Sequence, residues 1–276
     1  MAFKTNLDVR DLTPSMEYKL PSAGIPYLAK YPDFPETVVI KPFSMATEAY
    51  LMGNATAVDK MQYITSAVAK FPNGFDLNDL LVSDEYLILA IARALTYGEK
   101  YSFRCQCPSC GYSSIEDVIV PDNLPVKVWS RDTPPKCEIL LPVSKDMIEV
   151  KWLTIKDDRE ISKFIKQTES IGASGNVNNG WVRRTAYHLK SVNGGEPDNM
   201  MDAEAYMKRL PGPDVVAFND LIEQNGCGIK YDWWIKCDKC SFLYDRSVPI
   251  TSDFFRRNQV GRSDSNAEAN QPASGS

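Results

Sequence analysis

Apolar residues recur at three- and four-residue spacing through much of the first third of the chain, a pattern that predicts helices. After Ser44 this spacing runs through FSMATEAYLMG and TAVDKMQYITSAVAKF, which predict two helices. A third is predicted over LILAIARALTY, with Ser83 capping its first turn, Asp84 and Glu85 at its positive end, and Gly98 at its end. Because this segment is apolar around much of its surface, we expect it at the centre of a helical layer.

The pattern then changes to alternating apolar and polar positions, which indicates β-strands. Strands are predicted over KYSFRCQC, YSSIEDVIV and LPVKVW, followed by a hairpin that pairs CEILLPV with MIEVKWL through a short SKD turn. Helical spacing returns in DDREISKFIKQT, WVRRTAYHLKSV, AEAYMKRL and PDVVAFNDLIEQ, and IKYDWWIKCDKCSFLYDRSVPI predicts two strands around a cysteine turn. The predicted fold class is α+β, a helical layer with antiparallel β-hairpins.

The two ends of the chain differ from this core. Residues 1–43 are rich in proline, which interrupts helices and favours extended or turn conformations: Pro14, Pro21, Pro26, Pro32, Pro35 and Pro42. We expect an extended arm that lies along its own core or along a neighbouring molecule. Residues 44–255 are predicted to form a single α+β core. Residues 256–276 form a polar tail with too few apolar residues to fold alone.

Composition limits the kinds of protein that this chain can be. With 276 residues, 43% of them hydrophobic, it can bury a substantial core, as one large domain or two small ones. Lys+Arg 31 against Asp+Glu 36 gives a net charge of -5, so the whole molecule lacks the basic surface of a general nucleic-acid binder. We find no apolar run long enough to cross a membrane and no secretory signal sequence, and therefore expect a soluble protein made in a reducing cytoplasm.

The cysteines carry the most specific chemical signal. Cys107 and Cys110, followed by Gly111, have the spacing of a zinc knuckle, and Cys237 and Cys240 repeat it far downstream. Each pair lies between predicted strands, whereas a redox-active CxxC pair stands at the start of a helix. Tetrahedral zinc needs four ligands, and one knuckle supplies two. We therefore predict that these four cysteines hold one structural Zn²⁺ and join two hairpins as a split, discontinuous zinc ribbon.

The other cysteines are expected to be structural. Cys105 could replace Cys107 as a ligand or pack beneath the site, and the spacing to Cys110 favours the second reading. Cys137 and Cys227 are interpreted as small core residues. Four thiolates leave no open position for water or substrate, so the zinc is expected to close a long loop and its loss to loosen the core.

No catalytic set is apparent in the sequence. The single histidine, His188, lies in a predicted helix without a partner nucleophile, and the glycine-containing GASG and NGGE lack the setting of a phosphate-binding loop. We therefore expect a protein that is not an enzyme and has no small-molecule substrate. Aromatic pairs at Trp233–Trp234 and Phe254–Phe255 fit core packing or a protein interface. A binding or scaffold role is the default interpretation.

Three segments together resemble a known family. MATEAYLMGN, FDLNDLLVSDEYLILAIARALTYGEKYSFRCQCPSCG and PPKCEILLPVSKDMIEVKWLTIKDDREI are similar to the baseplate hub proteins of contractile-tailed, myovirus-type bacteriophages. The resemblance covers roughly residues 43–255 and leaves out the arm and the tail. It implies a structural or assembly component of the virion tail baseplate, made in the cytoplasm of the host bacterium.

The same resemblance implies that the partners are other tail proteins and further copies of this chain. The arm would then lie across a neighbour, and its deletion would leave a folded zinc-bound core that no longer assembles. The competing interpretation is a zinc-ribbon module that binds nucleic acid or takes part in transcription. The small number of basic residues near the knuckles weighs against this interpretation: Arg104, Lys236 and Lys239.

Overall fold

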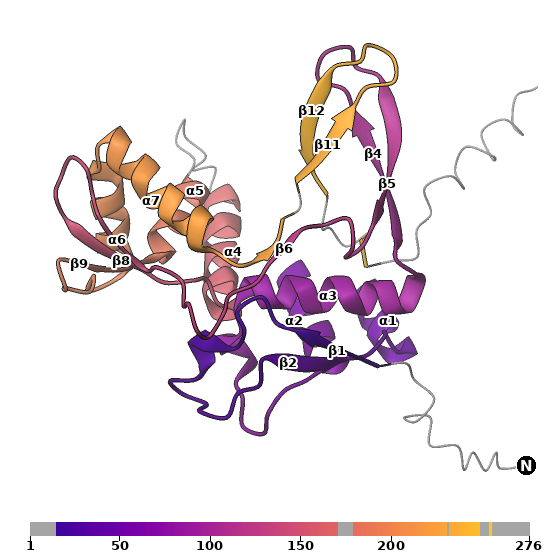
Figure 1. The fold of residues 1–276 in the computed structure, drawn as a ribbon, viewed down its shortest axis with the longest axis horizontal. Coiled ribbons are helices and arrows are strands. Elements are labelled where there is room, and N and C mark those ends of the chain that lie inside the picture. Colours follow the sequence, from indigo (N-terminus) through magenta and orange to yellow (C-terminus); the bar gives the residue numbers. More distant parts are fainter. Residues whose placement is uncertain (1–14, 171–178, 231, 249–253, 256–276) are drawn as a thin grey trace, which may run out of the picture.

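A computed structural model describes residues 15–170, 179–230, 232–248 and 254–255 (Figure 1). The chain forms a lower body of helices and a small sheet, a second helical body beside it, and a pair of projecting hairpins. The helices are α1 (Met45–Met52), α2 (Ala57–Val68), α3 (Val82–Tyr97), α4 (Ile155–Ser170), α5 (Asn179–Tyr187), α6 (Met200–Arg209) and α7 (Gly212–Asn225), with short 3-10 turns η2 (Ile25–Tyr27) and η3 (Leu77–Asp79).

The strands form five small antiparallel sheets among the described residues. Their bounds are β1 (Met16–Lys19), β2 (Thr37–Ile40), β3 (Ala69–Lys70), β4 (Lys100–Gln106), β5 (Ser113–Ile119), β6 (Val126–Lys127), β7 (Glu138–Leu140), β8 (Met147–Val150), β9 (Leu189–Val192), β10 (Gly228–Ile229), β11 (Asp232–Lys236) and β12 (Leu243–Ser247). They pair as β1-β2-β3, β4-β5, β6-β10, β7-β8-β9 and β11-β12. The predicted α+β class with antiparallel hairpins is confirmed.

Helix α3 is the centre of the lower body, as its apolar surface predicts. Its middle turns, from Leu87 to Ala92, are almost completely buried, and it ends at Gly98, which has a positive φ of 89°. The prediction for its start is wrong, because the helix begins at Val82 after Leu81, which offers no side-chain cap. Asp84 instead points into the core and accepts hydrogen bonds there.

The N-terminal segment packs against its own core from residue 15 onward. Tyr27 and Phe34 are buried in the main hydrophobic cluster, and β2 pairs with β3 in the lower sheet. Asp84 of α3 accepts hydrogen bonds from the Ser22 amide, at 2.9 Å, and from the Tyr27 hydroxyl, at 2.5 Å. The arm is expected to lie along its own core or along a neighbouring molecule, and residues 15–43 lie along their own core. Their deletion would remove core side chains, so the expectation that the arm is dispensable for folding does not fit this packing.

A second cluster of buried residues is formed by the sheet β7-β8-β9 with α5, α6 and α7. Its members include Ile148, Leu189, Met207 and Phe218, and Trp152 packs against both clusters. The long helix predicted over WVRRTAYHLKSV is wrong in its second half, since α5 ends at Tyr187 and the next residues form β9. The reason is tertiary: β9 pairs with β8, an interaction that helical spacing does not encode. The predicted segment limits at residues 43 and 255 stay a prediction.

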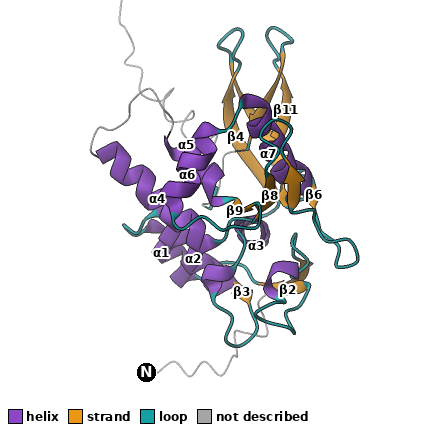
Figure 2. Cartoon of the chain, turned by 90° about the vertical axis from the view of Figure 1, so that its left-hand side faces the viewer, coloured by secondary structure: helices purple, strands orange, loops and turns teal. Residues whose placement is uncertain are grey.

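The two hairpins β4-β5 and β11-β12 stand side by side and project beyond the helices (Figures 1 and 2). We call these two hairpins and their turns the ribbon. At its base the buried Arg93 donates hydrogen bonds to the carbonyls of Gly98, Lys100 and Phe254. No helix in the described part of the chain has the length and apolar character needed to cross a bilayer.

Candidate metal centre

The first cysteine turn connects β4 to β5. The Cys107 amide donates to the Tyr112 carbonyl at 2.8 Å, and the Gly111 amide donates back to the Cys107 carbonyl at 2.9 Å. Gly111 has φ of +71°, a left-handed conformation that residues with a Cβ rarely adopt. Glycine after the CxxC pair is therefore favoured at this position, where it closes the turn without backbone strain.

The second cysteine turn connects β11 to β12 with the same hydrogen bonds. The Cys237 amide donates to the Phe242 carbonyl at 2.9 Å, and the Ser241 amide donates to the Cys237 carbonyl at 2.8 Å. Ser241 occupies the position of Gly111 and has φ of +58° despite its side chain. Two segments that are remote in sequence thus form the same local structure.

The two turns face each other and bring four sulfur atoms together. The Sγ atoms of Cys107, Cys110, Cys237 and Cys240 all lie within 4.8 Å of one another. Contacts across the two turns are 3.7 Å between Cys107 and Cys240 and 3.6 Å between Cys110 and Cys237. Four sulfurs bound to zinc at about 2.3 Å in a tetrahedron would be separated by about 3.8 Å. The arrangement can therefore hold one metal ion such as zinc.

The electrostatics of the cluster also suit a cation. Backbone amides of Cys240 and Lys239 help to lower the pKa of Cys237 to about 7, which favours the thiolate that metals bind. The Tyr112 amide acts in the same direction on Cys110, but desolvation together with the three neighbouring thiols outweighs it and raises the Cys110 pKa. Several thiolates at this separation repel one another, and a metal ion between them would remove that repulsion.

The predicted ligand set is therefore brought together, and the other cysteines are not part of it. Cys105 is buried in the main hydrophobic cluster beneath the turns, and burial raises its pKa, which disfavours a thiolate. Cys137 packs against the second cluster, whereas Cys227 packs against the main one and contacts the Ser83 hydroxyl at 3.3 Å. All three lie where small core residues are expected.

The other residues singled out in the sequence have structural surroundings. His188 follows α5 instead of lying within a helix, its Nδ1 is 2.9 Å from the Lys151 carbonyl, and burial lowers its pKa. Phe254 and Phe255 are buried against the main cluster, so core packing accounts for them. Trp234 is 66% exposed on β11, and the Trp233 side chain lies outside the described residues.

Sequence reasoning located no cavity, and the structure contains one beside Ser83 and Cys227, away from the metal centre. Its walls come from many separate segments, so no local motif could indicate it.

Comparisons with protein-family models, with curated proteins and with solved structures found no match to this chain.

Proposed function

We propose that the four cysteines bind one Zn²⁺ and that the metal joins the two hairpins into a split zinc ribbon. The observation that carries this proposal is the convergence of all four Sγ atoms within 4.8 Å. Zinc is the metal that an all-thiolate tetrahedral set of this kind most commonly holds. Metal analysis of protein purified in reducing buffer without added metal tests the assignment, with one zinc per chain as the expected result.

The zinc in this proposal is structural. Sulfur occupies all four positions of the tetrahedron, so no site remains for a water or a substrate. Each hairpin supplies only half of the ligands. One hairpin precedes the second helical body in the sequence, and the other follows it. Zinc binding would thus contribute directly to the folding of the segments between Cys110 and Cys237.

We further propose that the protein is a structural or assembly component of a bacteriophage tail baseplate, located in the virion and without catalytic activity. The family resemblance over residues 43–255 is the source of this proposal. An independent feature that supports a binding role is the set of large apolar side chains exposed on the ribbon: Tyr112 41%, Ile115 46%, Trp234 66%, Phe242 46% and Leu243 58%. Clusters of exposed apolar side chains are typical of surfaces that bind other proteins.

Strand geometry explains why these side chains face outward. On β11 and β12 the inward positions are Ile235 and Tyr244, which are buried, and the adjacent Trp234 and Leu243 therefore point away from the core. A projecting two-hairpin module with exposed apolar side chains would suit a contact with another tail protein or with a further copy of this chain.

Co-expression with the tail proteins of the same phage tests this function. The chain should co-sediment with at least one of them in a stable complex, and Trp234→Ser combined with Leu243→Ser should weaken that complex at unchanged zinc content. The matched control is Met201→Ser on α6, where the methionine is 74% exposed. If the wild-type protein sediments by itself whichever tail proteins are co-expressed with it, the proposed role is contradicted.

The competing nucleic-acid function finds no supporting charge pattern on the ribbon. The ribbon carries charges of both signs in equal number: Lys100, Arg104, Lys236, Lys239 and Arg246 against Glu116, Asp117, Asp232, Asp238 and Asp245. Lys100 is moreover paired with Asp117 at 2.7 Å. We expect the protein to elute from heparin at low salt, whereas retention at moderate salt would favour the nucleic-acid alternative.

A further inference from the structure

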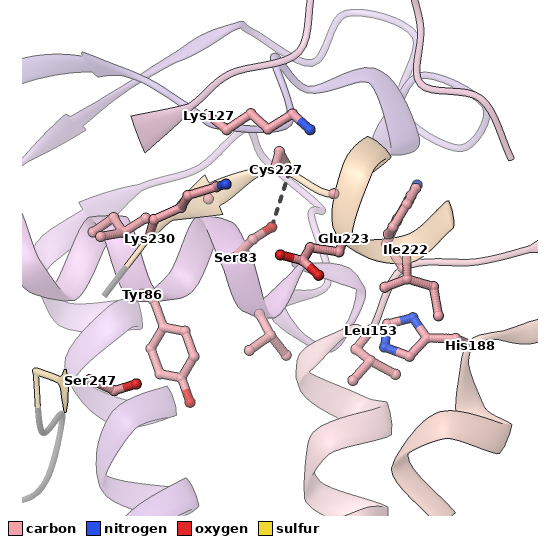
Figure 3. Close-up of a pocket in the computed structure, with 15 residues that line it drawn as sticks. Ser83, Tyr86, Lys127, Leu153, His188, Ile222, Glu223, Cys227, Lys230 and Ser247 are labelled. Atoms are coloured by element: carbon pink, nitrogen blue, oxygen red, sulfur yellow. Dashed lines mark hydrogen bonds between the residues drawn. The ribbon is translucent and has the colours of Figure 1, made fainter. Parts of the chain in front are cut away.

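A cavity of about 500 Å³ lies where the lower body, the second helical body and the base of the ribbon meet (Figure 3). It is lined by Ser83 of α3, Trp152 and Leu153 after β8, Ile222 of α7, and Ser247 at the end of β12. Its volume falls in the range of pockets that bind small organic molecules, roughly 300 to 1,000 Å³. It is separate from the metal centre and plays no part in the proposed baseplate function.

The apolar wall of the cavity is held in place by packing and hydrogen bonds. The Trp152 ring packs against Trp129 at 5.3 Å and against His188 at 6.5 Å between centroids. Trp129 in turn donates its indole N–H to the Asn225 carbonyl at 2.7 Å. The wall is therefore formed before any ligand arrives, which reduces the entropy lost on binding.

Two glycines, Gly226 and Gly228, also line the cavity. Gly228 has φ of +118°, and a Cβ at this position would lie 2.9 Å from the Ser83 Cβ. A Cβ at Gly226 would lie 2.8 Å from the Ile222 carbonyl oxygen. Glycine at 228 thus lets β10 pass close to α3, and glycine at 226 lets the chain turn close to the end of α7.

Two lysines come to the cavity from the same side of the β6-β10 pair. Lys127 of β6 lies directly opposite Gly228 of β10. Side chains two residues apart in a strand point to the same side, so Lys230 lies on the same side as Gly228 and Lys127. Figure 3 shows both side chains at the cavity, with the carboxylate of Glu223 near them. The Lys127 ammonium donates to the Gln224 carbonyl. Among the residues that the structure describes, Lys230 has no ion-pair partner, nor does Glu223.

We propose that this cavity binds a small amphipathic anion, with its apolar body against Trp152, Leu153 and Ile222 and its carboxylate or sulfonate toward Lys127 and Lys230. The two ammonium groups outweigh the single carboxylate of Glu223, so the charged rim favours a negative group. In this proposal the site binds the anion and does not react with it. Burial raises the pKa of Cys227 to about 12, so its thiol stays neutral and is a poor nucleophile. A bound ligand would contact α3, α7 and the base of the ribbon at once and stabilise their arrangement.

Fluorescence titration of the full-length, zinc-loaded protein with anilinonaphthalene sulfonate tests the site, with decanoate as competitor. Removing charge should have opposite effects at the two rim residues: Lys230→Gln should weaken binding by about 3- to 5-fold, and Glu223→Gln should tighten it by about 2-fold. Ile222→Trp, which fills the cavity, should weaken binding by more than about 10-fold. The charge-matched control is Lys208→Gln on α6, which should leave the affinity unchanged.

Zinc content and thermal unfolding establish that each variant is folded before its affinity is compared. Equal effects of Lys230→Gln and Lys208→Gln, or weaker binding in Glu223→Gln, would overturn the charge assignment and with it the proposed anion. The dye could also bind the exposed apolar face of the ribbon. Loss of the signal in Trp234→Ser, together with full binding in a folded Ile222→Trp variant, would place the dye there and overturn the cavity proposal.

Discussion

Cys107 and Cys240 are 133 positions apart in the chain, and their Sγ atoms lie 3.7 Å from each other. Cys110 and Cys237 form the reciprocal contact at 3.6 Å. The first cysteine of each turn thus faces the second cysteine of the other, which is the arrangement expected when two matching turns oppose each other around one ion. Neither turn can complete the site alone, so metal binding depends on the fold that brings them together.

Loss of one turn should remove the metal. In Cys237→Ser combined with Cys240→Ser we expect zinc to fall from one per chain to none and the unfolding temperature to fall by about 10 °C or more, because only two thiolates remain. Plasma emission spectrometry and calorimetry measure the two effects. Cys137→Ser, in the second cluster, is the control and should keep its zinc. Zinc retained by the double variant would show that the two turns do not share a metal.

Cys105→Ser should leave the metal site intact. Cys105 lies in the buried cluster beneath the turns and outside the group of four sulfurs. We therefore expect this variant to keep one zinc per chain with unchanged resistance to chelators. A drop in zinc content in a folded Cys105→Ser protein would mean that Cys105 takes part in binding.

The equivalent positions Gly111 and Ser241 should respond oppositely to substitution. Both have positive φ, so Gly111→Ala should cost about 1 to 2 kcal/mol and Ser241→Gly should gain about 1 kcal/mol in the free energy of unfolding. A Cβ at Gly111 meets only Gln106 Nε2, at 3.9 Å, so strain in φ and not a clash sets the cost. Urea unfolding gives both values. Ser241→Ala keeps the strain and should be nearly neutral, and a large loss in that control would assign the effect to the hydroxyl.

The Tyr27 hydroxyl should be important for the stability of the lower body. It donates to Asp84 at 2.5 Å and accepts from the Leu81 amide at 2.9 Å, and both contacts are buried. We expect Tyr27→Phe to reduce the free energy of unfolding by about 2 kcal/mol, because it leaves a buried carboxylate and a buried amide each short of a partner. The Tyr31 hydroxyl makes its hydrogen bonds nearer the surface, so Tyr31→Phe should lower the free energy of unfolding by less than about 1 kcal/mol. Equal costs would contradict this account of the N-terminal segment.

The stability of the protein should depend on the protonation of Glu85. Burial raises the pKa of this carboxyl from 4.5 to about 7, with the Thr65 hydroxyl as its hydrogen-bond donor. Below pH 4.5 the group is protonated in both the folded and the unfolded chain. As pH rises toward 7 the unfolded chain ionises first, so the folded state progressively loses stability.

Glu85→Gln does not titrate and should remove this loss. Its stability relative to the wild type should rise between pH 5 and pH 8, by about 3 kcal/mol at most, the equivalent of a pKa raised from 4.5 to about 7. Urea unfolding at both pH values measures the difference. Glu138→Gln, on the exposed side of β7, is the control. A relative stability that does not change with pH would show that Glu85 is not the titrating group.

Most elements and both cysteine turns could be predicted from the sequence because their causes are local. The repeat of apolar residues in α3, the strand alternation around Cys107 and Cys110, and the glycine after them act within a few residues. The errors arose where distant contacts decide the outcome. Leu189–Val192 becomes β9 because β8 lies beside it, and Asp84 points inward because Ser22 and Tyr27 donate to it.

The sequence by itself determined the candidate metal chemistry of this protein: two thiol pairs with CxxC spacing, each between predicted strands. Only the tertiary structure decided that the pairs meet, that residues 15–43 complete the core, and that Lys127 and Lys230 share a cavity with Ile222. The physical reason is that side-chain type and local spacing are properties of short segments. A metal cluster or a cavity depends on the relative positions of segments that only the packed core brings together.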